Sequence, residues 1–117
     1  MEKWEAIQPS GPAWLVMGSN PVSGATLIQS VTGKYAIAAL GSNVCFLGYG
    51  MTSDAARSAA VNLLLGAGPA QNCIPVAWGT TGPNPRGFTL APNQFFAGLS
   101  ASGTGIAPVV IIPCDGI

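Results

Sequence analysis

The sequence predicts a mainly β domain, an antiparallel β-sandwich or jelly-roll-like fold with an extended N-terminal arm and at most one short helix. Sixteen glycines and ten prolines are spread along the 117 residues and separate short apolar runs, a pattern typical of many short strands joined by turns. About eight such runs follow one another, as in a sandwich, a jelly roll or a small barrel. The chain is 49% hydrophobic with zero formal net charge, the opposite of a disordered composition.

The opening residues differ from the rest. They hold Trp4 and three of the eight charged residues, and Pro9 and Pro12 exclude a helix interior there. We therefore expect residues 1–12 to form an extended arm and residues 13–117 to form a single β-domain. Two arrangements of Trp4 and Trp14 remain open: they lie across a neighbouring subunit, or they fold back onto the core of their own chain.

The expected strands are the apolar runs between turn residues: Trp14–Gly18, Thr26–Ser30, Tyr35–Leu40, Asn43–Gly50, Ile74–Trp78, Gly87–Leu90, Gln94–Ser100 and Val109–Pro113. Phe95 and Phe96 point to opposite faces of their strand. One of them enters the core, and the other needs a second layer or another chain to cover it. The β-branched run 109–112 predicts a strand that is buried on both faces, or buried on one and docked on the other. Pro108 and Pro113 bracket this run, so pairing is expected to stop at both.

One segment favours a helix. Between Ser53 and Leu65 alanines and leucines recur at helical spacing, and alanine is the best helix former. Thr52 or Ser53 would be the N-cap, and Asp54 would lie in the positive first turn. Arg57 stands three residues after Asp54, a spacing that allows a surface ion pair. The alternative is an extended crossover between two sheets, with residues 61–65 as another strand.

Composition argues against catalysis. The chain has no histidine, which removes the Ser-His-Asp triad and histidine-based metal sites. Its four Lys and Arg residues are scattered, whereas a nucleic-acid-binding surface needs them clustered. The glycine pairs Gly48-x-Gly50 and Gly103-x-Gly105 do not complete a dinucleotide-binding fingerprint, so turns or bulges are expected there. We expect no enzyme activity, no cofactor, no metal and no nucleic-acid partner.

The three cysteines, Cys45, Cys73 and Cys114, are widely spaced. This spacing fits neither a C-x-x-C site nor a dense disulfide framework, so free thiols in a protein made in the cytoplasm are expected. No secretory signal and no membrane helix are evident.

Low charge favours burial against other protein surfaces, because eight charged residues make up only 7% of the chain, against roughly 25% in an ordinary soluble domain. Tryptophan and other large apolar side chains are the usual interface anchors. The candidate interface residues are Trp4, Trp14, Trp78, Phe95, Phe96, Val109 and Ile111.

A resemblance to known proteins lies in four segments: Asn43–Gly50 (NVCFLGYG), Gln71–Val76 (QNCIPV), Thr89–Phe96 (TLAPNQFF) and Pro113–Ile117 (PCDGI). In this order they resemble small structural proteins of tailed bacteriophages, in particular capsid decoration (cement) proteins. The resemblance implies a virion protein on the capsid exterior, without catalysis. Its partners would be the major capsid protein and further copies of itself, with a trimer preferred. The alternative is a carbohydrate- or receptor-binding module of a phage fibre or another surface assembly.

Overall fold

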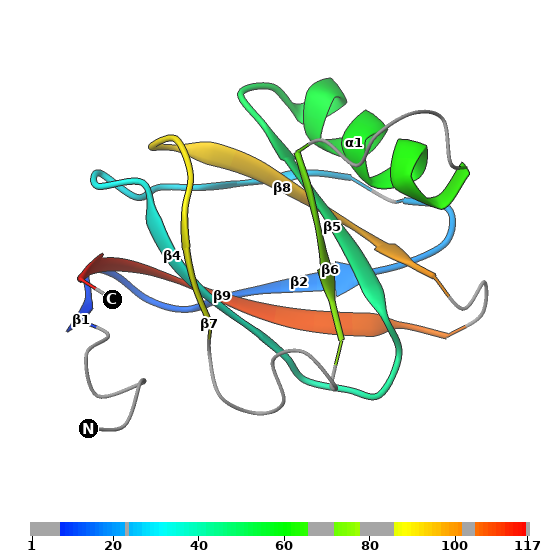
Figure 1. The fold of residues 1–117 in the computed structure, drawn as a ribbon, viewed down its shortest axis with the longest axis horizontal. Coiled ribbons are helices and arrows are strands. Elements are labelled where there is room, and N and C mark those ends of the chain that lie inside the picture. The colour runs from blue at the N-terminus through cyan, green and yellow to red at the C-terminus, as the bar shows by residue number, and fades with distance from the viewer. Residues whose placement is uncertain (1–7, 23, 66–71, 78–85, 102–104, 117) are drawn as a thin grey trace.

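Two antiparallel sheets and one helix make up the fold (Figure 1). The computed structural model describes residues 8–22, 24–65, 72–77, 86–101 and 105–116. Sheet A consists of β1 (Gln8–Pro9), β2 (Trp14–Gly18), β4 (Lys34–Ala39), β7 (Arg86–Thr89) and β9 (Ala107–Gly116). Sheet B consists of β3 (Thr26–Ile28), β5 (Cys45–Gly50), β6 (Cys73–Val76) and β8 (Gln94–Ser100), and the helix is α1 (Ser53–Leu65). The predicted mainly β fold with one short helix is confirmed, and the arrangement is consistent with a β-sandwich.

Strand β9 is the centre of sheet A. It pairs with neighbours on both edges: β4 pairs along one edge, and β1 and β2 pair one after the other along the opposite edge. On the β4 side Val109 lies opposite Ala39, and on the β2 side it lies opposite Val16. Residues 8 and 9 of the predicted arm thus belong to the sheet as β1. Trp4 lies outside the described residues, so both arrangements proposed for it remain predictions.

The expectation that pairing stops at Pro108 and Pro113 is wrong, because both prolines lie inside β9. In an antiparallel strand the N–H and C=O of one residue point to the same neighbour. The carbonyl of Pro113 accepts a hydrogen bond from the Ser10 N–H (2.9 Å), so its missing N–H falls where β1 gives way to β2. The carbonyl of Pro108 accepts one from the Leu40 N–H (3.1 Å), just past the end of β4. Neither proline interrupts a continuous neighbouring strand.

The core lies between the sheets, and Phe96 and Tyr35 are its largest fully buried side chains. Their rings meet edge to face with centroids 5.1 Å apart, a favourable aromatic geometry. The Tyr35 hydroxyl donates a hydrogen bond to the Ala91 carbonyl (3.0 Å) and accepts one from the Gln94 N–H (3.3 Å). This phenol is therefore buried with its polar end satisfied, and it ties β4 to the start of β8.

Helix α1 covers the outer face of sheet B, where it packs mainly on β5 and β8 (Figure 1). The helix prediction for Ser53–Leu65 is confirmed and the extended crossover is excluded. Thr52 is the N-cap, since its hydroxyl accepts a hydrogen bond from the Ala55 N–H (3.1 Å). Phe95 lies on this side of β8, half-buried against the cluster that contains Ala56 and Ala60. The second layer that one of the two phenylalanines required is therefore the helix.

The expectation that Gly48 and Gly50 form a turn or bulge is wrong, because both lie in β5 beneath the helix. A Cβ at Gly48 would lie 2.6 Å from the backbone nitrogen of Ala60, closer than two such atoms can approach. A Cβ at Gly50 would lie 2.8 Å from the Cβ of Ala55. The missing side chains let the helix backbone rest directly on the strand.

The helix contact predicts that Gly48→Ala lowers the free energy of unfolding by about 2–3 kcal/mol, because the added methyl forces the helix away from β5. Gly24→Ala is the matched control: Gly24 is exposed and a Cβ added there would meet nothing within 4 Å, so a change below about 0.5 kcal/mol is expected. Urea denaturation of the three proteins measures both effects. Equal stability of the two variants would contradict the close helix packing.

Candidate functional site

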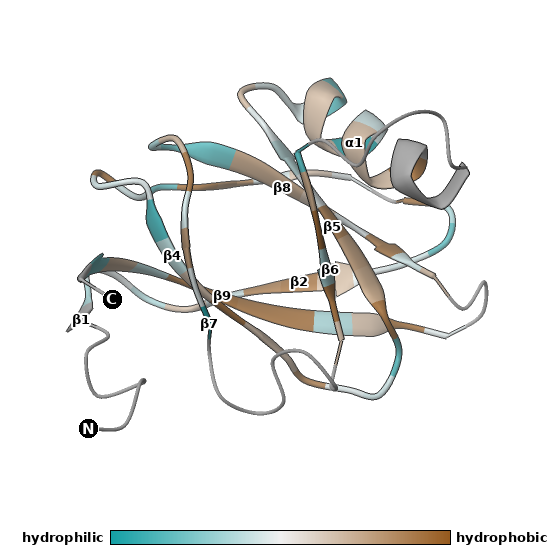
Figure 2. Cartoon of the chain, in the orientation of Figure 1, coloured by the Kyte–Doolittle hydropathy of each residue, from teal (hydrophilic) through white to brown (hydrophobic). Residues whose placement is uncertain are grey.

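The outer faces of the two sheets differ. Sheet B is covered by α1, whereas no described helix or strand packs on the outer face of sheet A. Along β2, Val16 points into the core, so Leu15 and Met17 point outward, with 54% and 44% of their surfaces exposed. Figure 2 shows that both β2 and β9 are hydrophobic along most of their length. Strand β2 is thus apolar on both faces, one of which faces the core and the other the surface.

Strand β9 extends this surface. Val109 and Ile111 point into the core and are fully buried, so the alternate residues 108, 110 and 112 point outward and are half-buried. Leu40, 54% exposed, lies at the end of β4 and is hydrogen-bonded to Pro108. The exposed surface ends at β4, because Ala36 and Ala38 of that strand are buried. We call this surface the apolar face; it consists of Leu15, Met17, Leu40, Pro108, Val110 and Ile112.

The apolar face carries no charge. No charged residue occurs between Glu5 and Lys34 in the sequence, and Lys34 and Asp115 lie near one end of β9, where both interact with Cys114. Contact with another protein would therefore not require burial of a charge. Burying an unpaired charge is the most costly part of forming an interface, so this face suits docking on an apolar surface.

The five predicted interface residues that the structure describes do not form one exposed surface. Trp14 begins β2 and is 38% exposed, but it lies on the same side of the strand as Val16, opposite to the apolar face. Phe95 is half-buried near α1. Three further candidates are fully buried core residues and contribute no exposed surface: Phe96, Val109 and Ile111. Trp4 and Trp78 lie outside the described residues.

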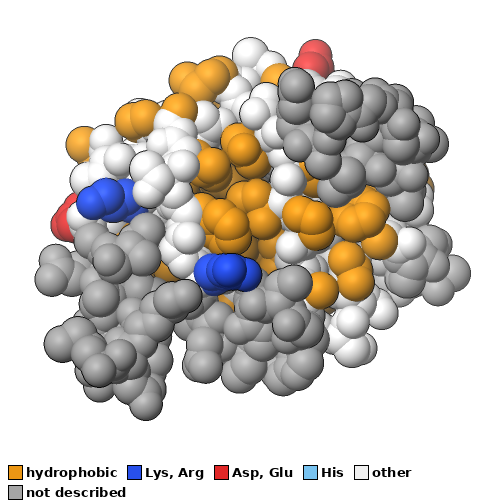
Figure 3. Space-filling view, viewed as in Figure 1, with side chains coloured by type: hydrophobic (Ala, Val, Ile, Leu, Met, Phe, Trp, Pro, Cys, Tyr) orange, Lys and Arg blue, Asp and Glu red, His pale blue; other side chains and the backbone are white. Residues whose placement is uncertain are grey.

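The exposed members of the face, Leu15, Met17 and Leu40, were not identified from the sequence. All five residues of Trp14–Gly18 are apolar or glycine, so alternation does not show which side of the strand is covered. One signal was available: the run lies in a long stretch without charge. Figure 3 shows a different face, where hydrophobic side chains gather around β6 and β7; the half-buried Ile74 and Phe88 of these strands pack against the core.

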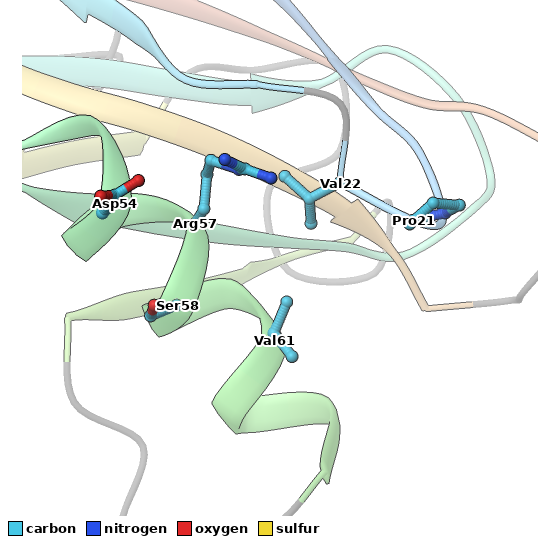
Figure 4. Close-up of a pocket in the computed structure, with 6 residues that line it drawn as sticks. All are labelled: Pro21, Val22, Asp54, Arg57, Ser58 and Val61. Carbon is cyan, nitrogen blue, oxygen red and sulfur yellow. The ribbon is translucent and has the colours of Figure 1, made fainter.

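A groove of about 560 Å³ lies between α1 and the chain that follows β2, lined by Pro21, Val22, Asp54, Arg57, Ser58 and Val61 (Figure 4). Its three polar residues, Asp54, Arg57 and Ser58, are all exposed. The expected ion pair between Asp54 and Arg57 is not formed, and Figure 4 shows the Arg57 side chain running toward Val22. The groove therefore offers one solvated carboxylate, one guanidinium and one hydroxyl, which do not form a nucleophile–base pair.

Metal-ligating side chains are dispersed over the described residues. Within these ranges no three His, Cys, Asp or Glu side chains are placed to hold a metal ion. The described part of the chain also contains no helix with the length and apolar character needed to cross a membrane.

The three cysteines are unpaired in the structure. Burial raises the pKa of Cys45 to about 12, and the neighbouring Cys73 adds to the rise. Burial also raises the pKa of Cys73 to about 11 and that of Cys114. Because the thiolate is the reactive form, all three are poor nucleophiles near neutral pH.

The buried Cys45 thiol predicts a loss of stability in alkali. The unfolded chain releases this proton above about pH 9 while the folded chain keeps it, so the free energy of unfolding falls as pH rises. Between about pH 8 and pH 10.5 this thiol accounts for a loss of about 2 kcal/mol. Urea denaturation at both pH values should show Cys45→Ala losing about 2 kcal/mol less than the original protein. Identical pH dependence of the two proteins would show that Cys45 is not held protonated.

In comparisons with known proteins the chain matches no protein-family model, no curated protein sequence and no solved structure.

Proposed function

We propose that this chain is a virion structural protein of a tailed bacteriophage, a decoration (cement) protein that binds the assembled capsid and stabilises it without catalysis. The four segments that resemble such proteins support this role, as do the 7% charged residues and the zero formal net charge. The observation that carries the proposal is the apolar face of sheet A. Exposed, contiguous apolar surface on a small domain marks a site of protein contact.

The proposed mechanism is contact across capsid subunits. Each copy lays its apolar face on the major capsid protein or on an adjacent copy, and removal of this surface from water supplies the attraction. A single contact of this kind is weak. Repetition over a symmetric shell makes the sum large, because neighbouring contacts hold each subunit near its site. The shell then resists heat and expansion as long as the copies remain attached.

The test is co-sedimentation with capsids that lack this protein. We expect the chain to sediment with the particles and to raise the temperature at which they open. Leu40→Asp places a charge on the apolar face and should weaken binding at least about tenfold, or about 1.4 kcal/mol. Val31→Asp is the matched control, because Val31 is 87% exposed and lies outside the face; it should bind as the original protein does.

Two results would overturn this proposal. Failure of the folded chain to bind any capsid surface, together with capture of cell-surface glycans, would favour the receptor-binding alternative. Equal binding by the Leu40→Asp and Val31→Asp variants would show that attachment does not use the apolar face.

A further inference from the structure

The edge strands of the two sheets are protected unequally. An exposed edge offers unpaired N–H and C=O groups to other chains, and proteins block it with charges, prolines or very short strands. Edge strand β7 carries the exposed Arg86, β6 carries Pro75, β3 is only three residues long, and β1 has two residues, one of them Pro9. Strand β2 has five residues, none of them charged or proline. It is the one edge strand of the described chain that lacks all three protections.

The outward-facing groups of β2 follow from the register. The Pro108 carbonyl faces the β4 side, where it accepts the Leu40 N–H, so the groups of Val109 face β2. Val109 lies opposite Val16, which therefore turns its backbone groups toward β9. The N–H and C=O of Leu15 and Met17 point to the free edge. Within the described residues no strand or loop pairs with them.

We propose that β2 pairs antiparallel with β2 of a second copy of this chain, around a two-fold axis at Val16. This register sets Leu15 opposite Met17 of the second copy, and Met17 opposite its Leu15. Both are the residues whose backbone groups point outward, so each of the two pairs closes two hydrogen bonds. The strand is thus complementary to itself, as an isologous interface requires.

The side chains of β2 also favour pairing with a second copy of the chain. Leu15 and Met17 are exposed on the outer face, so pairing places apolar groups side by side and joins the two apolar faces into one surface. Trp14 would lie opposite Gly18, which has no side chain to obstruct it. The uncharged stretch between Glu5 and Lys34 brings no like charges together. The inference does not rest on the capsid role; it predicts a dimer where the resemblance implies a trimer.

The test uses the isolated full-length chain in sedimentation equilibrium. We expect a dimer. Leu15→Lys/Met17→Lys places like charges opposite each other in both pairs, and the dimer dissociation constant should rise at least about tenfold. Leu15→Glu/Met17→Lys changes the same positions but places opposite charges together, so dimerisation should return. Val31→Lys, outside the edge, is the control for an added lysine and should remain dimeric.

Three results would overturn the proposal: a monomer or a trimer of the original chain, a dimer unaffected by the two lysines, or no recovery with the opposite charges. Amide hydrogen exchange gives a test without substitutions, which decides the matter if a variant fails to fold. The Leu15 and Met17 amides should become protected as protein concentration rises through the dimerisation range. Fast exchange at every concentration would show that the edge remains free.

Discussion

The pairing of β9 with three other strands is the constraint on which sheet A depends. Val109 and Ile111 fill the core from this strand, while β4 occupies one edge and β1 and β2 share the other. Because β9 takes the interior position, β2 is left at the edge of the sheet. The same alternation that buries Val109 turns Val110 outward. The core and the apolar face are therefore two sides of one strand arrangement.

The two outer faces differ because two glycines of β5 leave room for a helix on the outer face of sheet B. Gly48 and Gly50 let α1 lie directly on β5, and Ala56 and Ala60 complete the contact. Sheet A has no comparable layer among its described neighbours. On its β2–β9 side the large side chains of Leu15 and Met17 are exposed. One side of the domain is thus covered by its own helix, and the other presents apolar side chains of the kind that mark protein-contact sites.

Local signals predicted much of the fold. The bounds of β2, β8 and α1 agree with prediction, because glycine, proline or a capping residue marks their ends. The extent of β9 was missed, since a proline is tolerated only where no neighbouring strand needs its N–H, and that depends on distant residues. The contact of Gly48 with the helix was also missed, because it too depends on residues distant in the sequence. The apolar face could not be located, because whether Leu15 is covered is decided by tertiary packing.

We propose that the molecule contacts other proteins through the β2–β9 side of sheet A and leaves α1 in solvent. A density map of the proposed capsid–protein particle, with this domain fitted into it, tests this arrangement most directly. The account predicts protein density against Leu15 and Met17, and solvent beside the exposed surface of α1. A fit in which α1 is buried against a neighbour while β2 faces solvent would contradict it.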